Sequence, residues 1–367
     1  MLPIRFVASP GDLDGKKVVT VDGSFGPSPE AGLHLAHWPG NRTPDALRRD
    51  LSTEIAFAFQ DLEEAERARL AAGCTALAIN HYDTDGLCAL FALSEPERAA
   101  KHRELLVDVA ASGDLFEVRS TRAFAIDAAL RNLADPERSS AAASLADQPG
   151  IERKQSLVEA GLRLLGDLLD DEDAAPELWR DDVEALEADR RDLEGALFDD
   201  LVYLDLGVWT GPRGRASSRA SATQFFDPGR HAFLGSGRHD RALVLGPTEA
   251  GATARLVLGT RSFFDVVSRT PSARPDLAAL TARLNELEGR RGGGDAWRHQ
   301  ALAGASPELW FGSESLPLYA EHAGAALAPS RLDAEEIKRV VLDAIRDAWE
   351  LPDDDDEAED GEDIFAV

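Results

Sequence analysis

One apolar run of strand length leads directly into a short polar loop and then into a second apolar run. The first run covers residues 74–80, and the loop carries Asp83 and Asp85 before Gly86. The second run, residues 87–93, is apolar enough for a buried helix. A strand, a tight loop and a buried helix in this order are typical of α/β proteins with a parallel sheet.

Neighbouring segments repeat this alternation. Residues 17–21 (KVVTV) form a β-branched run that ends at Asp22, and residues 31–42 give a short strand followed by a Pro-Gly loop. Thr43 and Pro44 have the residue types of a helix N-cap and first helical position. Residues 105–109 (LLVDV) are a further strand candidate. We therefore expect an α/β fold whose N-terminal sheet is mostly parallel and covered by helices.

Changes in pattern divide the chain into four parts. Residues 1–150 form the N-terminal domain, and residues 151–200 read as two charged amphipathic helices that act as a helical connector. Strand signals return in residues 201–351, which predict a smaller α/β or α+β domain. This domain closes with an amphipathic helix over 330–351, where Asp333 and Glu336 predict a capping box. Residues 352–367 are an acidic tail, which we expect to be disordered.

Charge and apolar content limit the partners of the chain. It has 67 acidic and 39 basic residues, a formal net charge of −28, which disfavours binding to long nucleic acids. A small phosphorylated molecule suits this charge better. No run approaches twenty apolar residues and no signal-peptide layout is present, so we expect a cytoplasmic protein without a membrane segment. Two cysteines, Cys74 and Cys88, provide neither a disulfide framework nor a multi-cysteine zinc cage. The oligomeric state is left open.

The loop after residues 74–80 has the residue types of a divalent-metal site. Asp83 and Asp85 are two residues apart, so in an extended segment their carboxylates face the same side, and His81 shares that parity. Carboxylate oxygens are the ligands that hard divalent cations prefer. Gly86 permits a tight turn into a helix whose N-terminal amides can face a phosphate. The alternative is structural, with Asp83 as a helix cap and Asp85 in a turn.

Residues 80–89, NHYDTDGLCA, resemble the first motif of the DHH phosphoesterase superfamily, especially its RecJ-like branch. The resemblance implies a DHH-like N-terminal domain, metal binding by Asp83, Asp85 and His81, and two divalent ions, usually Mn²⁺ with Mg²⁺ as the alternative. These ions would activate water against a phosphodiester or phosphoanhydride in a cleft between two domains. With its HWPGN and NHYDTDG blocks, the whole chain also resembles a bacterial family of unknown function, which implies no activity.

The Asp-His-His motif of that superfamily is absent from the chain. The resemblance points to Asp108, on the expected strand 105–109, as the aspartate of the second motif, with Asp114 and Asp127 as second-choice candidates. Asp22 and His37 are candidate ligands from neighbouring segments, whereas His34 is expected to be structural. Two hypotheses stay open: a metal-dependent phosphoesterase with Asp83, Asp85 and His81 in catalysis, or a degenerate scaffold that binds a nucleotide or a protein. A third is a protein recruited to partners through its acidic tail.

The second half resembles the substrate domain of the same superfamily. Thr260-Arg261-Ser262, the helix-like residues 276–280 and the glycine-rich residues 291–295 occur in the expected order, with Asp295 in place of a histidine. The resemblance implies phosphate contacts from Arg261, Arg269, Gly292, Gly293, Gly294 and His299. The alternative for the glycine-rich segment is a flexible linker.

Overall fold

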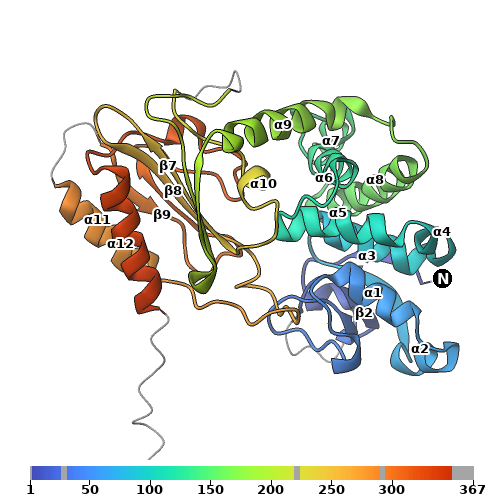
Figure 1. The fold of residues 1–367 in the computed structure, drawn as a ribbon. Coiled ribbons are helices and arrows are strands. Elements are labelled where there is room, and N and C mark those ends of the chain that lie inside the picture. Colours follow the sequence, from blue (N-terminus) through green and yellow to red (C-terminus); the bar gives the residue numbers. More distant parts are fainter. Residues whose placement is uncertain (1, 26–30, 219–223, 290–293, 349–367) are drawn as a thin grey trace, which may run out of the picture.

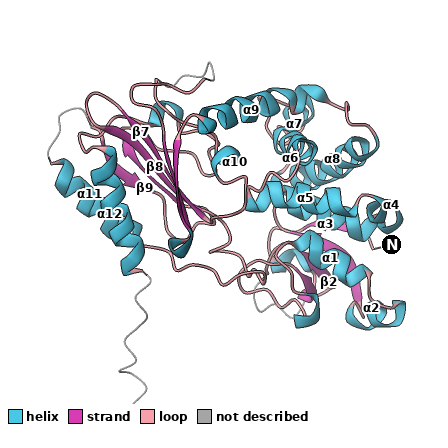
Figure 2. Cartoon of the chain, viewed as in Figure 1, coloured by secondary structure: helices cyan, strands magenta, loops and turns pink. Residues whose placement is uncertain are grey.

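The computed structural model describes residues 2–25, 31–218, 224–289 and 294–348, which form two lobes, each built around its own sheet (Figures 1 and 2). The first sheet has the strand order β1-β4-β2-β3, and all its strand pairs are parallel. Its strands are β1 Ile4–Phe6, β2 Lys17–Val21, β3 Ala31–Leu35 and β4 Cys74–Ile79. The parallel α/β fold expected for this region is confirmed. Because β2 and β4 are adjacent and parallel, the residues that follow them lie at the same edge of the sheet.

Helices supply most of the core of the first lobe, and α1, α3 and α8 contact the strands of its sheet. The helices of this lobe are α1 Ser52–Gln60, α2 Glu64–Leu70, α3 Thr84–Ser94, α4 Pro96–Lys101, α5 Arg103–Leu115, α6 Thr121–Leu133, α7 Ser140–Ser144 and α8 Gly150–Asp170. The buried helix expected after the polar loop is α3, which packs against β2, α1 and α5. The helix expected at Thr43-Pro44 is only a 3-10 turn, Asp45–Leu47, and α1 begins five residues after that turn.

The strand expected over residues 105–109 is wrong, because these residues lie within α5. Leu106, Val109 and Ala110 are fully buried, and their spacing of three and four residues is that of one helix face. A short apolar run does not distinguish a strand from a buried helix, and here the helical packing decides.

The two helices expected as a connector have different roles. α8 packs against α3, α6 and β1, and its apolar residues, including Val158 and Leu165, belong to the first core. It is therefore part of the first lobe. α9 Arg180–Glu194 contacts both α6 of the first lobe and α10 Arg230–Phe233 of the second.

The second lobe contains a mixed sheet of order β5-β6-β7-β8-β10-β9 in which only β6 and β7 pair in parallel. Its strands are β5 Leu197–Leu201, β6 Leu206–Thr210, β7 Arg241–Pro247, β8 Ala252–Leu258, β9 Ala296–His299 and β10 Glu308–Gly312. α11 Leu277–Glu288 and α12 Ala334–Asp347 lie together on the outer side of this sheet (Figure 1). The capping box of Asp333 and Glu336 at the start of α12 is confirmed. The acidic tail lies outside the described residues.

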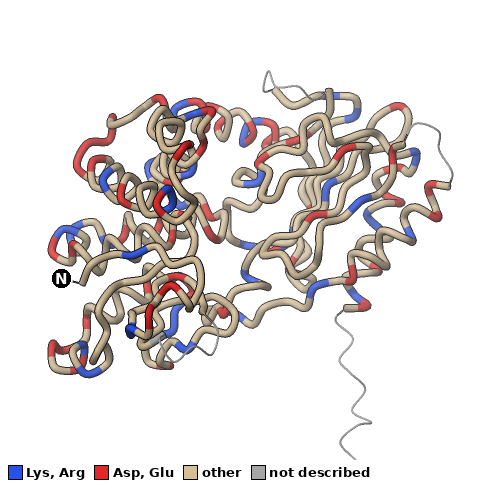
Figure 3. The backbone as a smooth tube through the Cα atoms, turned by 180° about the vertical axis from the view of Figure 1, so that it is seen from behind, with Lys and Arg blue, Asp and Glu red and all other residues tan. Residues whose placement is uncertain are grey.

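Basic and acidic residues are interspersed over both lobes in the described part of the chain (Figure 3). None of the described helices has the length and apolar character needed to cross a membrane.

A segment of the second lobe, residues 260–268, completes the core of the first. Phe264 is 6 % exposed and its ring stacks on His37 with centroids 4.0 Å apart. Thr260 donates a hydrogen bond to the carbonyl of Asp114, and the amide of Asp265 donates to the carbonyl of His37 at 2.8 Å. The two lobes therefore meet directly beside the polar edge of the first sheet.

Candidate metal centre

Two overlapping groups of acidic and histidine side chains lie at the carboxyl edge of the first sheet. The first consists of Asp22, His37, Asp85 and Asp114, and the second of Asp22, His81 and Asp83. Within each group the candidate ligand atoms all lie within 4.8 Å of one another. Asp22 follows β2 and belongs to both groups, so its two carboxylate oxygens can serve two neighbouring cations.

All four residues of the first group are buried. His37 Nε2 lies 3.1 Å from Asp114 Oδ2, 3.5 Å from Asp22 Oδ1 and 3.7 Å from Asp85 Oδ2. On the other side of the ring, Nδ1–H donates to the carbonyl of Asp50 at 2.5 Å. A backbone carbonyl at Nδ1 is the usual device that fixes a histidine so that Nε2 faces a metal.

The second group repeats this arrangement in a more open position. His81 Nε2 lies 2.5 Å from Asp83 Oδ2 and 3.2 Å from Asp22 Oδ2, and Nδ1 lies 2.7 Å from the side-chain oxygen of Asn80. The side chains of His81 and Asp83 are 27 % and 26 % exposed. Asp22 Oδ2 is buried and accepts no well-formed hydrogen bond from the described residues. A buried oxygen of this kind is what a cation would coordinate.

Asp83 and Asp85 are both candidate ligands, but Asp85 belongs to the first group and Asp83 to the second. The expectation that both face one ion from an extended segment is wrong, because the chain is already helical from Thr84 onward. Asp83 is the N-cap of α3 and accepts from the amide of Gly86 at 2.9 Å. A Cβ atom at Gly86 would lie 2.8 Å from Asp83 Oδ1 and 3.0 Å from Asp22 Oδ2. The glycine is therefore needed for the close approach of α3 to the carboxylates, rather than for a tight turn.

Asp85 lies in the first turn of α3 rather than in the loop turn that the structural alternative expected, and its carboxylate contacts a different helix. Its two oxygens accept hydrogen bonds from the amides of Ser52 and Thr53, at 2.7 and 2.8 Å, at the start of α1. Ser52 Oγ in turn donates to Asp22 Oδ1 at 2.6 Å. A carboxylate offers about four lone-pair positions, so these bonds orient Asp85 and leave capacity for a cation.

Burial and mutual repulsion dominate the electrostatics of the carboxylates. Burial, together with the charge of Asp83, raises the pKa of Asp114 well above its usual range. Burial and the charge of Asp22 raise the pKa of Asp85 to about 6, and burial also raises the pKa of Asp22. Burial and mutual repulsion therefore oppose the ionised form of these carboxylates, and a bound divalent cation would stabilise that form.

The two histidines are the positive partners within the groups. Burial alone would lower the pKa of His37, but its hydrogen bond to Asp114 and the surrounding carboxylates raise it to about 10. Burial opposes the charge of His81 as well, and Asp83 and Asp22 raise its pKa well above the usual range. Metal binding here would release protons from both imidazoles.

A cavity of about 420 Å³ opens beside the second group, between the lobes. His81, Asp83 and Asp114 form part of its wall. Five aromatic residues line it as well, namely Trp38, Tyr82, Phe116, Phe264 and Tyr319, and Arg131, His231 and Glu321 are its further charged or ionisable groups. The cavity is within the size range of small-molecule sites.

The candidates from the second motif fall in different places. Asp108 lies on α5, where it is paired with Arg119 at 3.4 Å, and it belongs to neither group. Its assignment depended on an expected strand that is in fact helix α5. The α5 residue that joins the first group is instead Asp114, about 1.7 turns further along the helix. Asp127 is buried next to the site but accepts a hydrogen bond from Thr84 instead. His34 lies in β3 beside Arg42 and is in neither group.

The expected phosphate-binding residues that the structure describes do not line the cavity beside the candidate ligand groups. Arg261 is buried in an ion pair with Glu117, and Arg269 donates to the carbonyl of Gly237 at 2.8 Å; both line a separate cavity of about 270 Å³. His299 is bonded to Thr281 in the second lobe, and Gly294 begins the approach to β9 with φ of 86°. Gly292 and Gly293 lie outside the described residues. The order of motifs in the sequence therefore did not predict which of these residues lie near the candidate metal ligands.

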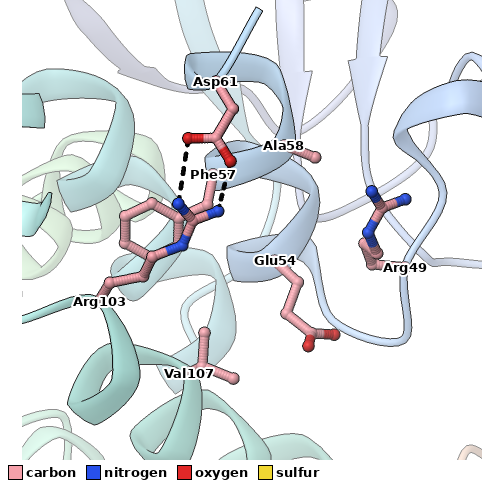
Figure 4. A pocket seen from close by; sticks show the side chains of 7 residues that line it. All are labelled: Arg49, Glu54, Phe57, Ala58, Asp61, Arg103 and Val107. Atoms are coloured by element: carbon pink, nitrogen blue, oxygen red, sulfur yellow. Dashed lines mark hydrogen bonds and ion pairs between the residues drawn. The ribbon is translucent and has the colours of Figure 1, made fainter.

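A further cavity of about 160 Å³ lies between α1 and α5 (Figure 4). Arg103 forms two hydrogen bonds with Asp61 across it, at 3.0 and 2.6 Å, so its guanidinium group is already paired. This cavity contains none of the candidate metal ligands.

Comparison with known proteins gives a family and no function. No curated protein and no solved structure matches the chain. One family profile matches residues 2–356, almost the whole length. The chain therefore belongs to the family described as a family of unknown function (DUF6687).

Proposed function

We propose that the protein is a divalent-metal-dependent, DHH-like phosphoesterase that hydrolyses a small phosphodiester or phosphoanhydride in the cavity between its lobes. The observation that carries this proposal is the pair of ligand groups that share Asp22 at the carboxyl edge of a parallel sheet. Ligands of open α/β sheets bind at this edge. Two neighbouring divalent sites are a recurrent arrangement in phosphoester hydrolysis.

The residues present fit a pair of hard divalent cations. Together the groups offer four carboxylates and two imidazoles, a donor set that suits Mn²⁺, with Mg²⁺ favoured less because of the imidazoles. Bound cations of this kind supply an activated water and charge stabilisation for the phosphoryl group. Asp50 and Asn80 hold the Nδ1 atoms of His37 and His81, so each Nε2 points into the cluster. Asp83 and His81 border the cavity and therefore meet the substrate.

The absent Asp-His-His motif favours the second candidate, a degenerate scaffold that binds a nucleotide or a protein without hydrolysis. Two observations weigh against that candidate. His37 and His81 bring two imidazoles to the cluster from separate segments of the chain, and six different residues surround it. We therefore prefer hydrolysis to simple binding.

The test is hydrolysis of bis(p-nitrophenyl) phosphate and p-nitrophenyl phosphate with and without Mn²⁺. Asp22→Asn keeps the shape of the shared side chain, so we expect it to abolish Mn²⁺-dependent hydrolysis while the protein stays folded by circular dichroism. Asp108→Asn, outside both groups, is the matched control and should retain activity. Equal hydrolysis by wild type and Asp22→Asn would overturn the proposal, and Mn²⁺ binding without hydrolysis of any phosphate ester would favour the scaffold.

A further inference from the structure

The basic side chains that line the interlobe cavity are His81, Arg131 and His231. His81 is a candidate metal ligand. His231 is engaged on both ring nitrogens, with Nδ1 2.7 Å from Glu321 Oε2 and Nε2 3.0 Å from the carbonyl of Ser112. This leaves Arg131 of α6 as the basic group that can bind a ligand.

Arg131 is held in position by one side of its guanidinium group. Its Nε donates to Asp127 Oδ2 at 3.1 Å. Asp127 is itself fully buried and accepts from Thr84 Oγ1 at 2.7 Å and from Ser112 Oγ at 3.2 Å. Asp127 is therefore fixed to the first turn of α3, which carries Asp83 and Asp85.

The terminal nitrogens of Arg131 have no hydrogen-bond partner among the described residues, so their donors are available to a ligand. The nearby Glu321 does not consume them, because its carboxylate is bound to the ring and the amide of His231. A guanidinium group with free terminal donors matches the oxygens of a phosphate in a two-pronged geometry.

The rest of the wall is suited to a ring rather than to a second charged group. Trp38 packs against both His81 and Phe264, with ring centroids 4.7 and 5.5 Å apart, so an aromatic surface begins directly at the metal ligands. Tyr319 and Phe116 are further aromatic residues that line the same cavity. Flat aromatic surfaces bind planar apolar groups by offset or edge contacts.

We infer that Arg131, positioned by Asp127, binds the phosphate of the substrate beside the metal cluster, and that the substrate is a compact phosphate ester with a planar ring as its organic part. This inference rests on the proposed function. It adds a substrate-binding residue, a positioning residue and the chemical class of the organic group. The cavity volume of about 420 Å³ accommodates one such molecule and not a polymer.

Two phosphonates that cannot be hydrolysed as esters test this inference: methylphosphonate and phenylphosphonate, titrated calorimetrically into Mn²⁺-loaded protein. They share the anionic group and differ in the ring. Phenylphosphonate should bind at least tenfold more tightly than methylphosphonate. Arg131→Gln should weaken both by roughly ten- to hundredfold, the range for hydrogen bonds between charged groups. Arg103→Gln, at the separate cavity of Figure 4, is the control and should change neither affinity.

A double-mutant cycle tests the positioning role of Asp127. Asp127→Asn should weaken phosphonate binding in the wild-type background and add little in the Arg131→Gln background, because Asp127 acts through Arg131. A purely structural role would lower affinity equally in both backgrounds.

Manganese content, measured in the same samples, separates the possible failures. Bound manganese with unchanged phosphonate affinity in Arg131→Gln, or with no phosphonate binding by wild type, overturns the inference and leaves the proposed function standing. Equal affinity for the two phosphonates overturns the assignment of a ring. Wild-type protein that binds no manganese overturns the proposed function and this inference with it.

Discussion

Phe264 joins the lobes beside the candidate metal-ligand groups, and we predict that its removal affects both stability and Mn²⁺ binding. The side chain comes from the second lobe, is 6 % exposed, and belongs to the core of the first. A buried aromatic side chain removes about 150–250 Å² from water. At about 25 cal/mol per Å², this area corresponds to roughly 4–6 kcal/mol as an upper bound. Measured Phe→Ala costs of about 3–5 kcal/mol agree with the lower part of this range.

Phe264→Ala should therefore lower the free energy of unfolding by about 3–4 kcal/mol in urea titrations followed by circular dichroism. Because the ring stacks on His37 at 4.0 Å, its loss frees the imidazole and should weaken Mn²⁺ binding. Loss of a group that orients a metal ligand typically costs about tenfold or more in affinity. Val267→Ala, three residues away and 53 % exposed, is the control and should change neither quantity appreciably. A Phe264→Ala protein with wild-type stability and wild-type Mn²⁺ affinity would refute the role of this segment.

Three further outcomes follow from the described contacts. Since burial and the charge of Asp22 raise the pKa of Asp85 to about 6 from an ordinary 3.8, the metal-free protein should lose about 3 kcal/mol of stability from this group as the pH rises from 4 through 6. Bound Mn²⁺ should remove that loss. Thermal unfolding in EDTA and in Mn²⁺ across this pH range measures the difference, and identical pH profiles under the two conditions would contradict it. Glu308 is buried between Arg230 and Arg255, so Glu308→Gln leaves two buried guanidinium groups without their anionic partner. This substitution should lower the free energy of unfolding in urea by about 3–5 kcal/mol, whereas Glu314→Gln on the surface should change it little. Asp333→Ala removes the capping box of α12 and should lower stability by about 1 kcal/mol, and a change below the error of the urea titration would argue against the cap.

Local patterns predicted the parts of the site that are adjacent in sequence. β2, β4 and the start of α3 could be predicted because a β-branched or apolar run, a polar loop and an apolar helix follow one another within a few residues. Asp22, His81, Asp83 and Asp85 were candidates for this reason, and all four lie in the ligand groups. Their division between two groups was not readable, because it depends on the residue at which the helix begins.

Contributions from distant segments could not be predicted in the same way. Asp114 was only a second choice, since its approach to His37 depends on how α5 packs, and the apolar run 105–109 suggested a strand instead. Arg131 had no sequence signal because it is one charged residue on an amphipathic helix. Its proposed role depends on the arrangement in space of Asp127, Thr84 and the aromatic side chains that both lobes contribute to the cavity. Arg261 is the opposite case. The order of motifs predicted that it contacts phosphate, whereas in the structure it is buried in an ion pair with Glu117.

The central claim is that Asp22 is shared by two cation sites, and anomalous diffraction at the manganese edge from crystals grown with Mn²⁺ tests it most directly. We expect two anomalous peaks on either side of the Asp22 carboxylate, roughly 3.5–4 Å apart as in other two-metal sites. One should lie near His37 Nε2 and the other near His81 Nε2. No peak at Asp22, or manganese bound only elsewhere in the protein, would contradict the account.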